Sequence, residues 1–155
     1  ARMLERNLLL LSEQVDYVVV DTPASMGTGM ISPVAASDFV FIPLCPTKKG
    51  TRGIQTFYQK LEAIRQKKSR LSIGGSFINQ YRKGDATQDQ IAIQLIKSMG
   101  GKMCPYTINH KVHFNQADIK RVPVWHLPKS GAQRTAAKEV IAVMKWIEAT
   151  VEASI

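Results

Sequence analysis

The chain has 155 residues, of which 45% are hydrophobic, and it carries a formal net charge of +9 at pH 7. This length and apolar fraction suit one folded domain and exclude a disordered tail. The positive charge favours an anionic partner, and nucleic acid is the leading candidate. The two cysteines, Cys45 and Cys104, have no metal-ligand spacing, so reduced thiols are expected rather than a zinc site.

The amino-terminal segment predicts a helix, a strand and a turn in succession. Residues 3–14 are rich in leucine and are expected to form a helix that packs on a sheet. Residues 17–20, Tyr-Val-Val-Val, predict a strand buried on both faces of a parallel sheet. Asp21 follows at the carboxyl end of this strand, where open α/β sheets bind ligands. The turn from Thr22 to Gly27 carries little side-chain bulk and can follow a phosphate.

Asp21 has two interpretations at this point. At the end of a Walker B strand, an aspartate holds a hydrated magnesium ion that bridges nucleotide phosphates. In many other α/β proteins, a strand-terminal aspartate only caps the next helix or closes a turn. The stretch around Asp21 favours neither interpretation by itself.

The remainder of the chain alternates strands with helices. Alternation of this kind is typical of βαβ units and of a parallel sheet. No domain boundary is apparent, so residues 1–155 are expected to form a single α/β domain. Strands are predicted at residues 38–44, 71–78 and 103–108, and helices at residues 30–36, from 54 to the basic cluster at 67–70, around 91–99, and at 131–152.

The surplus positive charge falls mainly in residues 48–70 and 97–138. Neither region is a homopolymeric run, so the charge is expected to belong to folded elements. A solvated surface charge remains the simpler explanation for any one of these cations. Taken together, they are a better candidate for an anion-binding surface.

Five motifs follow one another along the chain: VDYVVVDTPASMG (15–27), AASDFVFIPLCP (35–46), FINQY (77–81), YTINHKVHFNQADIKRVPVW (106–125) and KSGAQRTAAKEV (129–140). In this order they resemble the ParA/MinD group of deviant Walker ATPases, in its ParA (Soj-like) branch. The resemblance implies an α/β fold in which helices flank a parallel sheet, as in P-loop NTPases of the SIMIBI class.

The resemblance implies a nucleotide site. Asp21 resembles the Walker B aspartate, which positions magnesium through water. The switch region that senses the γ-phosphate corresponds to residues that include Thr22, Pro23, Ser25 and Gly27. Asn79 matches an asparagine that contacts the adenine ring, a role suited to an amide that both donates and accepts. Ile108 and Asn109 fall where the family lines the other side of the base, although family members usually have proline in place of Asn109 and Ala24.

The resemblance also implies macromolecular partners. In ParA-like proteins, the nucleotide-bound homodimer binds DNA without sequence preference, and a ParB-like adaptor links it to the centromere. We therefore expect a cytoplasmic protein associated with the nucleoid. The cations in the corresponding region are Lys111, Lys120, Arg121, Lys129 and Arg134.

The family's phosphate loop, KGGxGKT, does not occur in this sequence. The chain resembles the carboxyl-terminal part of a ParA, and its sheet is expected to be incomplete at the amino-terminal side. ATP and magnesium are the expected cofactors of the complete protein, and the chain alone is not expected to hydrolyse ATP. A non-enzymatic DNA-binding or interaction module derived from a ParA is an alternative function.

A MinD-like cell-division positioning protein is a second alternative. Such proteins end in a basic amphipathic tail that binds the bilayer surface. This sequence ends in EATVEASI, and it has no apolar stretch near the roughly 20 residues that cross a bilayer. DNA is therefore preferred to a membrane as the predicted partner.

Overall fold

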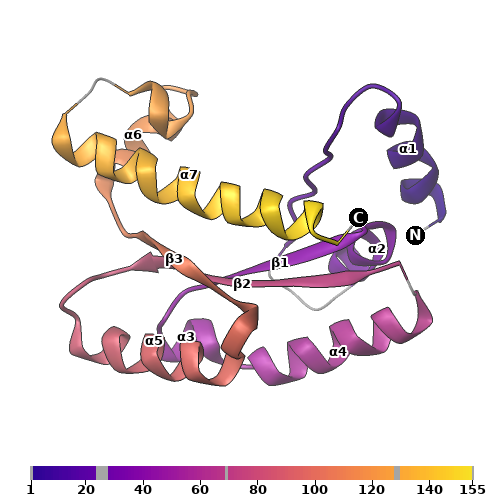
Figure 1. The fold of residues 1–155 in the computed structure, drawn as a ribbon, viewed down its shortest axis with the longest axis horizontal. Coiled ribbons are helices and arrows are strands. Elements are labelled where there is room, and N and C mark those ends of the chain that lie inside the picture. Colours follow the sequence, from indigo (N-terminus) through magenta and orange to yellow (C-terminus); the bar gives the residue numbers. More distant parts are fainter. Residues whose placement is uncertain (1, 24–27, 69, 128–129, 155) are drawn as a thin grey trace. The chain divides into compact units, whose positions relative to one another are not determined.

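The computed structural model describes residues 2–23, 28–68, 70–127 and 130–154. The chain divides into a first unit of residues 1–40 with 53–73 and a second unit of residues 41–52 with 74–155. Three strands form one parallel sheet in the order β1-β2-β3 (Figure 1). They are β1 (Phe39–Leu44), β2 (Ser72–Tyr81) and β3 (Met103–Asn109). The predicted parallel α/β sheet is therefore confirmed.

The first unit contains the helices α1 (Arg2–Ser12), α2 (Thr28–Ala36) and α4 (Ile54–Lys67). Helix α1 contacts α2. The buried apolar side chains of this unit include two from α2 that are one turn apart, and one from the apolar face of α4. The apolar residues of α4 recur at the helical period, and the face that they form is the one that the helix buries. These buried residues are Met30, Val34, Leu61 and Leu71.

The second unit places helices on both faces of its part of the sheet. Helix α7 (Gly131–Glu152) lies along one face, and α3 (Lys48–Thr51) and α5 (Ala86–Met99) lie on the other (Figure 1). Strands β2 and β3 pair in parallel, with Ser76 opposite Met103 and Tyr81 opposite Asn109. The carboxyl ends of these two strands therefore lie side by side.

Local signals in the sequence determine where the long helices of this unit begin and end. Asp85 caps α5 by accepting hydrogen bonds from the backbone N–H groups of Thr87 and Gln88, at 3.0 and 3.1 Å. Gly100 follows the last residue of α5 with a φ of +53°. Ser130 and Gln133 form a reciprocal capping box at the start of α7. Both predicted helices are confirmed, and α7 has the predicted bounds.

Two glycines of β2 let other groups approach its backbone closely. A Cβ on Gly74 would lie 2.4 Å from ring atoms of Phe41. A Cβ on Gly75 would lie 2.4 Å from the carbonyl oxygen of Lys102, and Gly75 has a φ of +136°. Trp146 of α7 packs edge to face on Phe41, with the ring centroids 5.6 Å apart. The two glycines therefore make room for β1, for the start of β3 and for α7.

A separate apolar cluster joins α7 to α6 (Val112–Ile119) and to a short 3-10 helix at Val124–His126. The sequence analysis predicted no helix between residues 109 and 130, so α6 was missed. Its apolar side chains do not all lie on one face of the helix. Val112 and Ile119 are 63% and 82% exposed, whereas Ala117 is buried. The buried members of the cluster are Ala117, Val124, Leu127 and Ala136.

The predicted strand at residues 17–20 was wrong. These residues have no regular secondary structure, and Val19 is 93% exposed. A strand exists only through hydrogen bonds to neighbouring strands, and none of the three described strands pairs with this segment. The apolar composition therefore predicted that the side chains of residues 17–20 are buried in a sheet, but no described strand covers them.

Candidate functional site

Asp21 lies in the first unit with an exposed side chain. No hydrogen bond or ion pair to another described residue engages its carboxylate. A single carboxylate can hold a hydrated magnesium ion through water, so Asp21 fits the implied ion in its chemistry. Thr22 is half-buried and Pro23 is exposed, whereas Ser25 and Gly27 lie outside the described residues.

The other residues that were predicted to bind nucleotide lie in the second unit, at the carboxyl ends of β2 and β3. Asn79 Oδ1 accepts a hydrogen bond from the backbone N–H of Gln80 at 2.9 Å. Gln80 has a φ of +55°, and the β2–β3 register shifts between Ile78 and Tyr81. Irregularities of this kind re-aim side chains at sheet edges. Because Oδ1 faces Gln80, the amide nitrogen of Asn79 is the group that can donate to a base.

Asn109 is engaged by Glu139 of α7, a residue that the sequence did not single out. The Asn109 backbone N–H donates to Glu139 Oε2 at 3.0 Å, and Asn109 Nδ2 donates to Glu139 Oε1 at 2.8 Å. A carboxylate only accepts hydrogen bonds, so the NH2 group of Asn109 must face it. Asn109 Oδ1 is consequently left buried, with no hydrogen-bond partner among the described residues. Ile108 beside it is half-buried.

Tyr81, which pairs with Asn109 across the sheet, donates a hydrogen bond to Asp89 of α5 at 2.5 Å. This hydrogen bond is the main cause that raises the pKa of the Tyr81 phenol, because it stabilises the neutral, donating form. Partial burial and the negative charge of Asp89 act in the same direction. The contact ties the end of β2 to the first turn of α5.

We expect Tyr81→Phe to destabilise the protein at neutral pH but not at strongly alkaline pH. The folded-state pKa is raised, so the contribution of Tyr81 is complete below the ordinary tyrosine pKa of about 10 and is lost as pH rises through the raised value. Urea unfolding of both proteins across this pH range measures the difference. Tyr106→Phe, at a half-exposed tyrosine in the same unit, is the control. A difference that grew with rising pH would contradict the assignment.

The cations that were predicted to bind DNA differ in their surroundings. Lys120 and Arg121 are exposed at the end of α6, and Arg134 is exposed in the first turn of α7. Lys111 instead pairs with Glu139, with Nζ 2.5 Å from Oε1, and its side chain is only 19% exposed. Lys129 lies outside the described residues.

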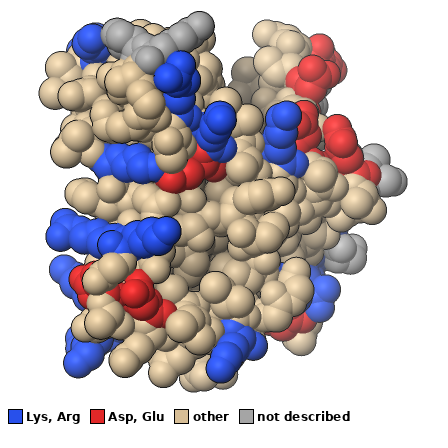
Figure 2. Space-filling model, turned by 60° about the vertical axis from the view of Figure 1, so that its left-hand side comes forward, with Lys and Arg blue, Asp and Glu red and all other residues tan. Residues whose placement is uncertain are grey.

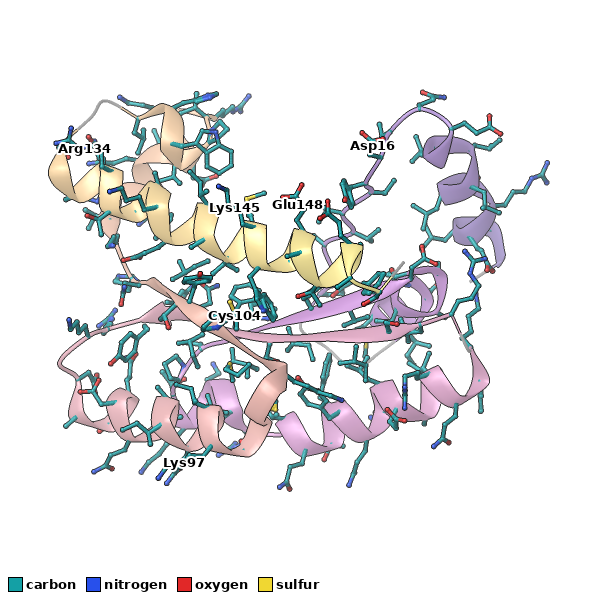
Figure 3. The ribbon with its side chains drawn as sticks, viewed as in Figure 1. Asp16, Lys97, Cys104, Arg134, Lys145 and Glu148 are labelled. Atoms are coloured by element: carbon teal, nitrogen blue, oxygen red, sulfur yellow. The ribbon has the colours of Figure 1, made fainter. Side chains whose placement is uncertain are left out.

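Helix α7 extends the exposed basic surface beyond the predicted residues. At about 100° per residue, Lys138 and Lys145 fall within about 40° of Arg134 on the helical wheel. All three are exposed, and Figure 3 shows Arg134 and Lys145 on the side of α7 that faces away from the sheet. The helical period of the sequence could have identified Lys138 and Lys145. We call the exposed cations at the end of α6 and in the first two turns of α7 the basic surface; they are Lys120, Arg121, Arg134 and Lys138.

The order of charges along α7 opposes the helix dipole. Arg134 stands in the first turn, which has no acidic residue, and Glu152 stands in the last, which has no basic residue. A helix favours the reverse order by about 0.3–1 kcal/mol for each charge. Helix α5 follows the favourable order, with Asp89 in its first turn and Lys97 in its last. Helix stability therefore does not explain the order of charges along α7.

The positive charge of the chain belongs almost entirely to the second unit. This unit has 14 Lys and Arg against 6 Asp and Glu, or +8, whereas the first unit has 7 against 6, or +1. Figure 2 shows that Lys and Arg side chains stand at the surface of the visible face, with a few acidic groups among them. The second unit is thus the one that is suited to a polyanion.

Among the described residues, no three His, Cys, Asp or Glu side chains gather as a metal site, and no helix in that part of the chain is long and apolar enough to cross a membrane. An open cavity of about 420 Å³ lies between α3 and α5. It contains none of the predicted site residues, and it is lined by Lys48, Thr51, Thr87, Gln90, Ile91, Gln94 and Leu95.

Comparison with known proteins found one matching family model and several similar proteins. A family model described as an AAA domain matches residues 1–73. Protein IncC of Escherichia coli is 25% identical over 94% of this chain and 40% of its own length. The chromosome-partitioning ATPase Soj of Treponema pallidum is 24% identical over 90% of the chain and 57% of its own length. The chromosome partitioning protein ParA of Caulobacter vibrioides is 27% identical over 81% of the chain and 49% of its own length.

The chain therefore spans about half the length of these relatives. The matches extend over most of the chain and agree with the parallel α/β sheet. Together, the family model and these relatives support the predicted resemblance to the ParA/Soj-like partition ATPases.

Proposed function

We propose that this chain serves DNA partition, as part of a ParA-type ATPase whose nucleotide-bound dimer binds DNA without sequence preference. The observation that carries the proposal is the exposed basic surface formed by α6 and α7. Its cations stand in the unit with a net charge of +8, and those on α7 are ordered against the helix dipole. The partition functions in the names of Soj and ParA support the same proposal.

The type of side chain supports contact with the phosphate backbone rather than with particular bases. Lysine and arginine neutralise phosphates and release the counterions condensed on DNA, which gives affinity without sequence preference. The basic surface offers these charges on helical elements that a shared apolar cluster holds together. Binding through such a surface would place the protein on the nucleoid.

The nucleotide roles belong to the same proposal. Asp21 would hold magnesium through water, with Thr22, Pro23, Ser25 and Gly27 in the switch region. Asn79 would donate to the adenine ring, and Ile108 and Asn109 would line the other side of the base. ATP and magnesium would then drive dimerisation, and a ParB-like adaptor would link the protein to the centromere.

The test is binding of the protein to a fluorescent duplex of random sequence, followed by anisotropy, with and without ATP and magnesium. The four phosphate contacts of one chain predict a slope of log K against log salt near −3.6, which is about a 150-fold loss of affinity between about 50 and 200 mM salt. A second duplex of unrelated sequence should bind equally well. The proposed DNA partner would be abandoned if neither duplex bound at about 50 mM salt.

A further inference from the structure

The Glu139 carboxylate of α7 is surrounded by hydrogen-bond donors. Three donors from the end of β3 and the start of α6 converge on its carboxylate. They are the Asn109 backbone N–H at 3.0 Å, Asn109 Nδ2 at 2.8 Å and Lys111 Nζ at 2.5 Å. The two bonds from Asn109 hold the carboxylate in place independently of Lys111.

The pair between Lys111 and Glu139 is unlike the other ion pairs between described residues. Its side chains are 19% and 17% exposed, whereas those of Lys68–Glu5 are 34% and 39% exposed, those of Arg65–Glu62 are 51% and 39% exposed, and those of Arg70–Asp38 are 78% and 66% exposed. Exposed pairs exchange readily with water and contribute little. A partly buried pair must be broken and resolvated before its lysine can meet another anion, which costs free energy.

We propose that Glu139 masks Lys111, so that DNA meets the basic surface while Lys111 stays paired within the protein. The inference rests on the proposed DNA binding and deepens it, because it excludes a lysine that the sequence had placed among the DNA ligands. Lys111 then contributes no counterion release, since its charge is already neutralised in the free protein.

The binding test compares three variants by the salt dependence of duplex binding. Lys111→Gln should leave the slope of log K against log salt unchanged. Glu139→Gln retains an acceptor for Asn109 but frees Lys111, so the slope should steepen by about 0.9, and affinity at about 0.1 M salt should rise about eightfold. The double variant should return to the wild-type slope and affinity.

The double variant and a charge control separate unmasking from simple loss of a negative charge. Glu148→Gln removes an exposed acid from the same helix and should leave the slope unchanged (Figure 3). If the double variant kept the gain of Glu139→Gln, the effect would belong to Glu139 alone, and the masking proposal would be wrong. A slope reduced by about 0.9 in Lys111→Gln would overturn it even if Glu139→Gln failed to fold.

A readout without DNA distinguishes the failure of this inference from the failure of the proposed function. Limited acetylation with acetic anhydride, followed by peptide mass spectrometry, should modify Lys111 more slowly than Lys120 and Lys138. Glu139→Gln should remove this protection. Protection without any DNA binding would refute the proposed function alone, whereas equal reactivity of the three lysines in the wild-type protein would refute the masking.

Discussion

Replacing the whole basic surface by glutamine is expected to lower DNA affinity by more than about 1000-fold at about 0.1 M salt. Each lost phosphate contact removes about 0.9 from the slope of log K against log salt, so four losses remove nearly all of the expected slope. The variant combines Lys120→Gln, Arg121→Gln, Arg134→Gln and Lys138→Gln. Glutamine keeps much of each side chain and changes no buried residue, so folding measured by circular dichroism should be preserved.

The control removes the same charge from elsewhere in the second unit. Lys48, Lys49, Lys97 and Lys102 are all exposed, and their replacement by glutamine changes the net charge by the same amount. Charges that do not contact DNA act only through the screened long-range field, so the loss should stay below about tenfold at this salt concentration. Equal losses in the two quadruple variants would mean that net charge, rather than this surface, binds DNA.

Gly75→Ala is expected to lower the free energy of unfolding by about 2–4 kcal/mol. The added Cβ would meet the carbonyl oxygen of Lys102 at 2.4 Å and Trp146 at 3.1 Å, and the backbone contact cannot yield by a change of rotamer. The φ of +136° adds strain, because residues with a Cβ rarely adopt it. Urea unfolding measures the loss.

The matched control is Gly101→Ala. A Cβ on Gly101 would meet nothing within 4 Å, so the change should stay within about 0.5 kcal/mol of the wild type. Equal stability of Gly75→Ala and Gly101→Ala would show that β2 and β3 do not approach as closely as the structure indicates.

Sequence patterns predicted the helices that depend on local features, such as an apolar period or a glycine that ends a helix. The apolar period of residues 54–64 and the glycine after Met99 correctly indicated α4 and the end of α5. The same reasoning failed at residues 17–20, because apolar composition predicts burial only where other strands supply hydrogen bonds. It also missed α6, whose short length and scattered apolar residues give no helical period.

The candidate site was predicted less completely than the fold. Family motifs selected Asp21, Asn79 and Asn109, and their roles remain proposals. Nothing in the sequence around Lys111 indicated its pairing with Glu139, because the two residues are 28 positions apart and meet only through the packing of α7 on β3.

By itself, the sequence determined the family resemblance, the parallel α/β class and the surplus of positive charge. The family resemblance rests on motifs at strand ends, the α/β class rests on the hydrophobic period, and the surplus charge rests on composition. Each of these is a property of short stretches of sequence. Only the tertiary structure decided which cations remain exposed, because the environment of a side chain depends on groups that folding brings beside it. Glu139 of α7 pairs with Lys111, which lies at the start of α6. Arg134 and Lys138 lie near Glu139 on α7, but they face solvent.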